Sequence, residues 1–127
     1  MTPNQFRIGN LVKYDGQIFR LHSIGEYPIL DTIEFGAKVV EWKDLEPVEI
    51  TEEVLRGMGF KNYQEITYRW FLKMRSPLSI LVYDLDDHTA AAGSQWLDPM
   101  KYPHAHQLQN LIFSLTGEEV TINTDVL

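Results

Sequence analysis

The dipeptide Asp15-Gly16 stands between two runs rich in β-branched and aromatic residues, at positions 6–14 and 17–24. A two-residue type I′ turn needs a positive φ at both central positions, and Asp-Gly is one of the few pairs that adopts it readily. The sequence therefore predicts a β-hairpin centred on Asp15-Gly16. Such a hairpin is stable only within a larger sheet, so more strands must follow.

Two further strand candidates lie at residues 30–35 and 38–42. Gly36-Ala37 separates them and favours a second tight turn. Four strands this close together predict a small curled antiparallel sheet. An SH3-like or other small barrel is the closed alternative, in which glycines permit the sharp strand bends.

A short helix is predicted between residues 47 and 60. Thr51 is a suitable N-cap, and the two glutamates that follow it complement the positive end of the helix dipole. Gly57 or Gly59 should end this helix, because glycine readily leaves the helical conformation.

The alternation of residues 67–75 predicts a strand that pairs with residues 78–83 to form a central hairpin, with Ser76-Pro77 at the turn. The polar, small-residue segment 84–94 is expected to be a mobile loop. On the first strand, alternation places four side chains on the face predicted to be core: Tyr68, Trp70, Leu72 and Met74.

A second helix is predicted over residues 103–116. Pro103 suits an N-terminal helical position and Gly117 suits a left-handed C-cap. Residues 119–123 are expected to add an edge strand. The apolar stripe of the helix repeats at helical spacing: Leu108, Leu111, Ile112 and Leu115.

The chain of 127 residues, 44% of them apolar, has the length and composition of one globular domain. We therefore expect a single α+β domain over residues 1–127, with a β-rich subregion at 1–46 and a mixed remainder at 47–127. Its expected parts are the curled N-terminal sheet, the central hairpin and an amphipathic C-terminal helix packed on the strands.

Composition excludes several functional classes. The formal charge is −7, and the 11 Lys and Arg residues are scattered, which disfavours a duplex nucleic acid or an anionic membrane as partner. The chain has no cysteine, so disulfides, thiolate nucleophiles and Cys-ligated zinc are ruled out. Residues 1–10 lack a signal-peptide pattern and no apolar run approaches the ~20 residues of a membrane span, so the expected compartment is the cytoplasm.

The stretch KYPHAHQLQNLIFSLTGEEV, residues 101–120, resembles a C-terminal signature of an uncharacterised family of small proteins from Bacteroidota genomes, their phages and mobile elements. The signature is a His-Gln-Leu-Gln-Asn-Leu run, residues 106–111, followed by Leu-Thr-Gly-Glu-Glu, residues 115–119. The opening run at 7–12 and the helix at 47–60 also resemble this family, whereas residues 88–99 depart from it. The resemblance implies a lineage and an architecture but no substrate and no catalytic residues.

The C-terminal helix has a second face opposite its apolar stripe. Projection at 100° per residue gathers His106, Gln109, Asn110 and Phe113 there. An aromatic ring among two amides and an imidazole predicts a surface that binds a ligand, a partner protein or a second copy of the chain. If the surface joins two copies, Phe113→Glu should dissociate them. The competing interpretation is that the helix is buried on both sides and the amides cap neighbouring loops.

A divalent metal site is an alternative hypothesis. His88, His104 and His106 with Asp84, Asp86 and Asp87 are ligand types that could hold a metal and activate water for hydrolysis. Residues two apart on a helix point roughly 200° apart, however, so a helix through His104 and His106 would separate their rings. No metal ligand, cofactor or catalytic residue is therefore assigned.

Binding of single-stranded nucleic acid is a third hypothesis. Phe71 lies among Arg69, Lys73 and Arg75, and bases stack on aromatic rings beside cations. No nucleophile-elbow, P-loop or dinucleotide-binding motif occurs.

The absence of a strong catalytic motif favours a non-enzymatic binding module of bacterial or phage origin, engaging a protein partner or a small ligand. A role in host interaction or in sequestering a small molecule follows only by analogy of lineage. A small metal-dependent hydrolase is the alternative.

Overall fold

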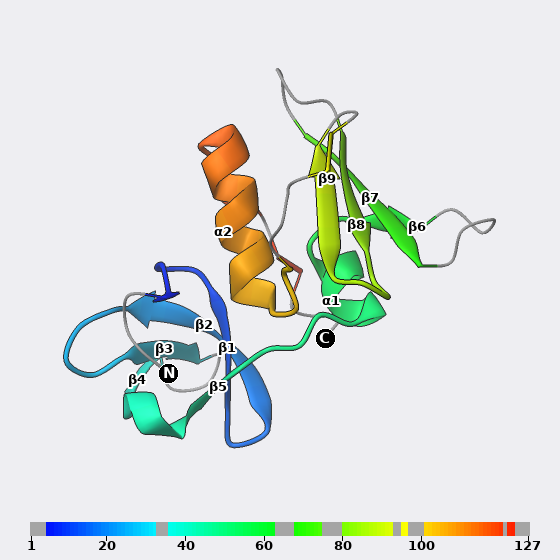
Figure 1. Ribbon diagram of the computed structural model, residues 1–127. Coiled ribbons are helices and arrows are strands. Elements are labelled where there is room, and N and C mark those ends of the chain that lie inside the picture. The colour runs from blue at the N-terminus through cyan, green and yellow to red at the C-terminus, as the bar shows by residue number, and fades with distance from the viewer. Residues whose placement is uncertain are drawn as a thin grey trace. The chain divides into compact units, whose positions relative to one another are not determined.

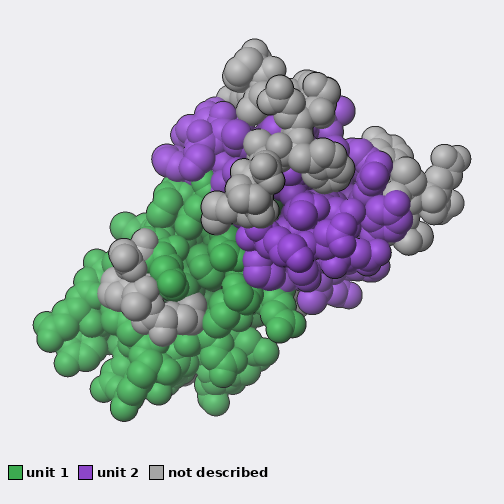
Figure 2. Space-filling model, viewed as in Figure 1, with its two compact units in different colours: residues 1–49, 104–110 green, residues 50–103, 111–127 purple. Residues whose placement is uncertain are grey.

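A computed structural model describes residues 5–32, 36–62, 68–74, 80–92, 95–96, 101–120 and 122–123. The described residues form two five-stranded antiparallel sheets and two α-helices, which confirms the α+β class (Figure 1). The chain divides into two compact units (Figure 2). Unit 1 comprises Met1–Glu49 and His104–Asn110, and unit 2 comprises Ile50–Pro103 and Leu111–Leu127.

The sheet of unit 1 has the strand order β4-β3-β2-β1-β5. Because β4 and β5 are its two edges, the sheet is open and the closed-barrel alternative does not occur. The strands are β1 Leu11–Tyr14, β2 Gln17–Ser23, β3 Ile29–Thr32, β4 Gly36–Val39 and β5 Leu45–Pro47.

The Asp15-Gly16 hairpin is confirmed. Tyr14 pairs with Gln17 across the turn, and φ is 50° at Asp15 and 77° at Gly16. Both values lie in the left-handed region that a type I′ turn requires. The local chemistry of two residues thus sets the register of β1 against β2.

The predicted turn at Gly36-Ala37 is wrong. Both residues lie inside β4, where Gly36 pairs with Thr32, and the connection at 33–35 lies outside the described residues. The predicted strand 38–42 also ends early, because Trp42–Asp44 forms a 3₁₀ turn, η2, closed by an Asp44 N–H bond to the Glu41 carbonyl. This turn carries the chain from one edge of the sheet, β4, to the other edge, β5.

The core of unit 1 lies on the sheet face lined by Val12, Leu21 and Leu30. Each such aliphatic side chain contributes about 1.5–3 kcal/mol when buried. Phe19 and Trp42 are partly buried beside it, and the Trp42 indole N–H donates to the Gly25 carbonyl at 2.9 Å. The buried cluster as a whole is Phe6, Val12, Leu21, Leu30, Val40 and Leu45.

The sheet of unit 2 has the strand order β10-β9-β8-β7-β6, with the predicted central hairpin as β7 and β8. Trp70 of β7 is buried and pairs with Tyr83 of β8. The expected Ser76-Pro77 turn lies outside the described residues. The strands are β6 Lys61–Asn62, β7 Arg69–Lys73, β8 Ile80–Asp84, β9 Thr89–Ala92 and β10 Gln95–Trp96.

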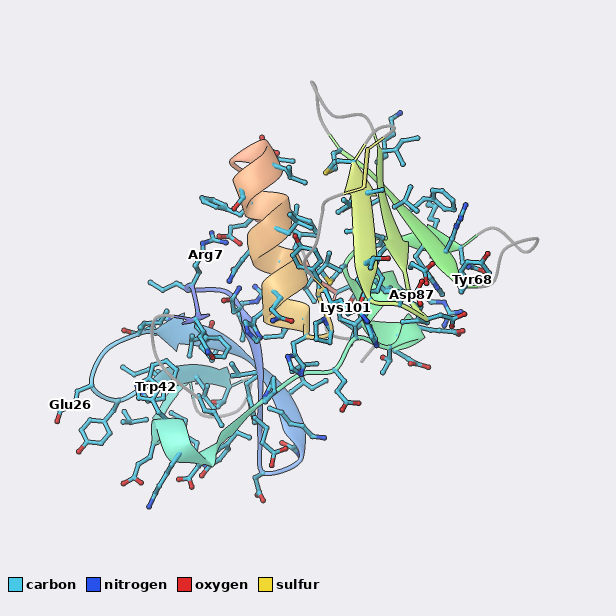
Figure 3. All side chains as sticks on the ribbon, viewed as in Figure 1. Arg7, Glu26, Trp42, Tyr68, Asp87 and Lys101 are labelled. Atoms are coloured by element: carbon cyan, nitrogen blue, oxygen red, sulfur yellow. The ribbon has the colours of Figure 1, made fainter. Side chains whose placement is uncertain are left out.

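Tyr68 is not part of the core, contrary to the alternation pattern. It lies just before β7 (Figure 3), and 39% of the residue is exposed. The Arg69 guanidinium lies 5.7 Å from the centre of its ring, a cation–π contact. Trp70 and Met74 are buried as the alternation predicts, and Leu72 is half-buried.

The expected mobile loop at 84–94 is largely ordered structure. A turn at 85–88 leads into β9, whose residues 90–92 are buried alanines, while residues 93–94 lie outside the described part. Asp84 Oδ1 fixes the turn by accepting the N–H groups of Asp86 at 2.9 Å and Asp87 at 3.0 Å. The small side chains of this segment are typical of a loop, but in this structure they belong to a buried strand that pairs with β8.

The Tyr83 hydroxyl ties this turn to a later segment. It donates to the Tyr102 carbonyl at 2.7 Å, so the contact with His88 Nδ1 at 2.8 Å must use an imidazole N–H as donor. Burial, with the nearby Asp84 charge, raises the pKa of Tyr83 above its usual value. His88 is held with φ at 58°, and its carbonyl accepts the Tyr102 N–H at 2.7 Å.

We expect Tyr83→Phe to lower the free energy of unfolding by about 2 kcal/mol, because a buried carbonyl and a ring N–H lose their partner. Urea denaturation followed by circular dichroism measures the change. The control is Tyr27→Phe, which removes the hydroxyl of an exposed tyrosine and should leave the midpoint unchanged. Equal midpoints for the two variants would contradict a structural role for the Tyr83 hydroxyl.

The shorter helix, α1 Glu52–Gly57, is capped as predicted. Thr51 Oγ1 accepts the Val54 N–H at 3.3 Å, and Gly59 leaves the helix with φ at 93°. This confirms the N-cap and the glycine stop.

The longer helix, α2 Ala105–Thr116, begins two residues after Pro103. Gly117 confirms its predicted cap, with φ at 73° and its N–H on the Phe113 carbonyl at 2.7 Å. Among the described residues, neither helix is long and apolar enough to cross a membrane.

The prediction of an edge strand at 119–123 is wrong. Its described residues, 119, 120, 122 and 123, are not in a strand. Instead, the Asn123 N–H donates to the Gly57 carbonyl at 2.7 Å. The last turn of a helix leaves carbonyl groups without partners inside the helix, and this bond satisfies one of them.

Candidate functional site

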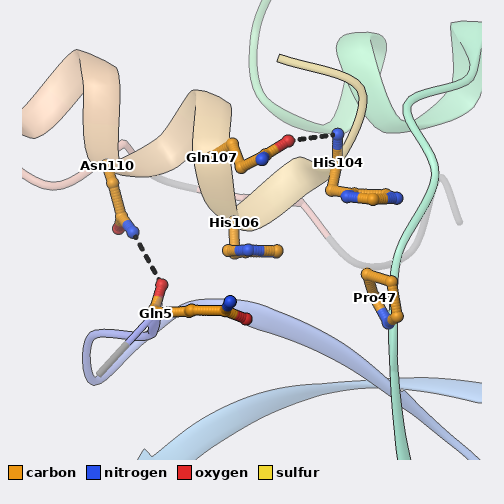
Figure 4. Close-up of a pocket in the computed structure, with 6 residues that line it drawn as sticks. All are labelled: Gln5, Pro47, His104, His106, Gln107 and Asn110. Carbon is orange, nitrogen blue, oxygen red and sulfur yellow. Dashed lines mark hydrogen bonds between the residues drawn. The ribbon is translucent and has the colours of Figure 1, made fainter. Parts of the chain in front are cut away.

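A pocket of about 420 Å³ lies within unit 1, at the start of α2 (Figure 4). Its walls come from three parts of the sequence: the segment before β1, the end of β5 and the first turns of α2. The described residues that line it are Gln5, Pro47, His104, His106, Gln107 and Asn110. Imidazole and amide groups therefore dominate this described part of the lining.

The first turn of α2 is fixed by side-chain and backbone partners. His104 occupies the N-cap position, and its N–H donates to Gln107 Oε1 at 3.0 Å, which is one half of a capping box. The Ala105 N–H donates to the Val48 carbonyl at 2.8 Å. Helix N-termini leave N–H groups without internal partners, and these two bonds satisfy two of those donors.

The two histidines at the pocket lie beside each other. Their ring centroids are 5.9 Å apart and the ring planes differ by only 8°. The expectation that residues 104 and 106 point apart is therefore wrong. It assumed that both are helical, whereas His104 precedes the helix and has backbone freedom that a helical residue lacks.

His106 is buried and is not fully hydrogen-bonded. Only 5% of the residue is exposed, and no hydrogen-bonding group in the described part of the chain reaches its Nδ1. The Phe6 ring lies beside it, with centroids 4.3 Å apart. Burial, together with the neighbouring His104, lowers the pKa of His106 to about 4, so its imidazole is neutral at pH 7.

Gln109 joins α2 to the chain just before β1. Its Oε1 accepts the Leu11 N–H at 2.8 Å and its Nε2 donates to the Gly9 carbonyl at 3.0 Å. On the other side of this segment, Gly9 N–H and the Asn10 carbonyl bond to Leu21 of β2, each at 2.8 Å. One buried amide thus takes the place of an additional strand along residues 9–11.

Asn110 completes the connection. Its Oδ1 accepts Asn10 Nδ2 at 2.9 Å and Arg7 Nη1 at 3.3 Å, and its Nδ2 donates to the Gln5 carbonyl at 3.4 Å. Asn10 is itself fully buried, and its Oδ1 accepts the Arg7 N–H at 2.6 Å. The run 7–12 and the run 106–111, which carry the family resemblance, are therefore hydrogen-bonded to each other.

The four residues of the predicted second face have different positions. His106 and Asn110 line the pocket, Gln109 is 1% exposed and holds the backbone beside it, and Phe113 is 36% exposed and does not line the pocket. For Gln109 and Asn110 the geometry matches the interpretation in which amides cap a neighbouring segment.

Sequence reasoning missed Gln5, Pro47 and Gln107 as pocket residues. It also considered His104 only as a metal ligand. The one available signal was Gln107, three residues after an N-cap, which is the position of the second capping-box residue.

The hypothesis of a metal-dependent hydrolase gains no support. No group of three or more His, Asp or Glu side chains in the described residues could hold a metal ion. Asp84 accepts backbone N–H groups, and His88 Nδ1 is engaged by Tyr83. These side chains stabilise a turn in unit 2, whereas His104 and His106 belong to unit 1.

Comparisons of the chain with protein families, with curated proteins and with solved structures find no match. Function is therefore inferred from the geometry of the pocket.

Proposed function

We propose that the chain is a non-enzymatic binding module whose pocket in unit 1 holds a small ligand. The observation that carries this proposal is the pocket itself, whose described lining joins two imidazoles and three side-chain amides. His106 Nδ1, like Arg69 Nε and Trp70 Nε1 elsewhere in the described residues, is buried without a partner, which costs about 1–3 kcal/mol.

The polar side chains next to His106 on α2 differ from it because they do form hydrogen bonds within the chain. Gln109 and Asn110 use both ends of their amides in hydrogen bonds, and the Gln107 carbonyl oxygen is bonded to His104. Within the same two turns of helix, His106 Nδ1 alone among the buried side-chain polar atoms described is unsatisfied. A bound molecule would supply the missing hydrogen bond once the side chains that close this atom to solvent move aside.

Saturation-transfer NMR with a mixture of small uncharged compounds tests the proposal on the full chain. We expect binders to the native protein that lose their signal in His106→Phe, which keeps a flat ring but removes the nitrogen. The matched control is His22→Phe, because His22 is exposed on β2 and lies outside the pocket. Equal signals from both variants, or no binder at all, would refute a ligand site at His106.

We also propose that the chain shares its lineage with the Bacteroidota and phage proteins that it resembles. In this chain the runs that carry the resemblance contact each other, because the amides of the C-terminal signature bond to the N-terminal run. Residues that depend on each other in this way should be retained together in any relative.

A further inference from the structure

The sheet of unit 2 buries one face and leaves part of the other exposed. Directly paired residues of antiparallel strands point to the same face, and neighbours along a strand point to opposite faces. Trp70 of β7 pairs with Tyr83 of β8, and both are buried. Phe71, the next residue of β7, therefore points to the other face, where it is only partly buried. The function proposed above does not use this second face.

Two exposed lysines flank Phe71 on this face. Lys61 belongs to β6, beside β7 (Figure 1), and is the direct partner of Phe71, while Lys73 lies two residues further along β7. Paired Cα atoms are about 4.5–5.5 Å apart, and two residues along a strand span about 6.6 Å. The lysines are therefore immediate neighbours of Phe71 in two directions of the sheet. Next to them, β8 contributes Val82, partly exposed, and Ile80, 45% exposed.

The charge on this face is positive beside Phe71 and is balanced at one end of the sheet. Among the described strand residues of the face, the carboxylate is that of Asp84, which is buried and accepts two N–H groups of the turn at 85–88. Asp84 stands opposite Arg69, so their formal charges offset each other, and the turn carries two further aspartates. An anionic group would be attracted to the two lysines and repelled from that end.

An aromatic ring with ammonium groups on two sides is a combination that binds single-stranded nucleic acids, because a base stacks on the ring while cations contact the phosphates. An acidic peptide could use the lysines, but a carboxylate side chain has no flat surface to place on the ring. A duplex keeps its bases stacked on one another and meets a chain whose formal charge is −7. The side chains on this face therefore favour an unpaired strand.

We propose that this face of the unit 2 sheet binds single-stranded nucleic acid, with a base stacked on Phe71 and phosphates on Lys61 and Lys73. The face belongs to unit 2 and the pocket to unit 1, so this proposal does not depend on a ligand in the pocket. Lys61 joins the group only through the pairing of β6 with β7, whereas Arg75, which the sequence grouped with these cations, lies outside the described residues.

Fluorescence anisotropy with labelled oligothymidylate and oligoadenylate of about 12 nucleotides, titrated with the full chain at low salt, tests the proposal. We expect binding that weakens with salt, with a slope of log K against log[salt] of about −1.4, because about two phosphates are neutralised. The duplex annealed from the two strands, and polyglutamate, should bind more weakly. Failure of both single strands to bind, or equal or tighter binding of the duplex or of polyglutamate, would overturn the proposal.

Two double variants locate the phosphate contacts. Lys61→Gln with Lys73→Gln should weaken binding of the single strands about tenfold at low salt and bring the salt slope close to zero. The matched control is Lys43→Gln with Lys101→Gln, which removes the same charge from exposed positions outside the sheet and should bind like the native chain. Equal losses in the two double variants would mean that only net charge matters, and the site would be wrong.

Substitutions at Phe71 test the stacking contact. Phe71→Leu keeps an apolar side chain and removes the ring, so it should weaken binding at least about fivefold, whereas Phe71→Tyr keeps the ring and should bind like the native chain. Thermal unfolding of each variant shows whether it is folded. A folded Phe71→Leu variant that binds as tightly as the native chain would overturn the proposal. If this variant does not fold, the exposed lysine pair still decides it.

Discussion

Gln109→Leu should lower the free energy of unfolding by about 3 kcal/mol, although leucine is more hydrophobic than glutamine and has a similar volume. The substitution leaves the Leu11 N–H and the Gly9 carbonyl without their partner. Each buried backbone group that loses its hydrogen bond costs about 1–3 kcal/mol. Gln109 is 1% exposed, so water cannot easily replace its amide.

Urea denaturation of the full chain measures this effect. The matched control is Gln107→Leu, the same substitution two residues earlier on α2. Gln107 is only half-buried and caps a single N–H, so its loss should cost about 1 kcal/mol or less. If the two variants were equally stable, the Gln109 amide would not be the main connection between α2 and residues 9–11.

The features that sequence analysis predicted correctly depend on local backbone chemistry. Asp15-Gly16 requires a type I′ turn, Thr51 caps α1, and Gly117 ends α2 in a left-handed conformation. In each case the groups that determine the turn or the cap lie within a few residues of one another. The local sequence is therefore enough to predict the backbone conformation.

The features that it missed depend on distant partners. The segment at 84–94 contains small and polar residues typical of a loop, yet Ala90–92 form a buried strand because β8 supplies a neighbour. Asn123 lies outside any strand, and its N–H bonds to the end of α1. A strand is stable through its neighbours, and single-sequence patterns do not specify them.

The candidate site was only partly predictable for the same reason. Helical projection placed His106 and Asn110 on one face, and both do line the pocket. The projection could not show that Gln109 would be buried against residues 9–11, about a hundred positions earlier in the chain. Nor could it show that His104 stands outside the helix, where its ring can lie parallel to that of His106.

Acidification should destabilise the protein through His106. The pKa of this imidazole is about 4 in the folded chain, below the 6.5 of a free histidine. As the pH falls through 6.5 the unfolded chain binds a proton that the folded chain excludes, so the free energy of unfolding decreases. The loss continues until the pH reaches about 4, below which both states are protonated and no further change arises from this group.

Between about pH 7.5 and about pH 5, this linkage corresponds to roughly 2 kcal/mol. Urea denaturation at the two pH values, on the native chain and on His106→Phe, isolates it, because every other titrating group is common to both proteins. The native chain should lose about 2 kcal/mol more than the variant. Equal losses would mean that His106 is protonated equally in the folded and unfolded states. Burial of His106 would then not lower its pKa.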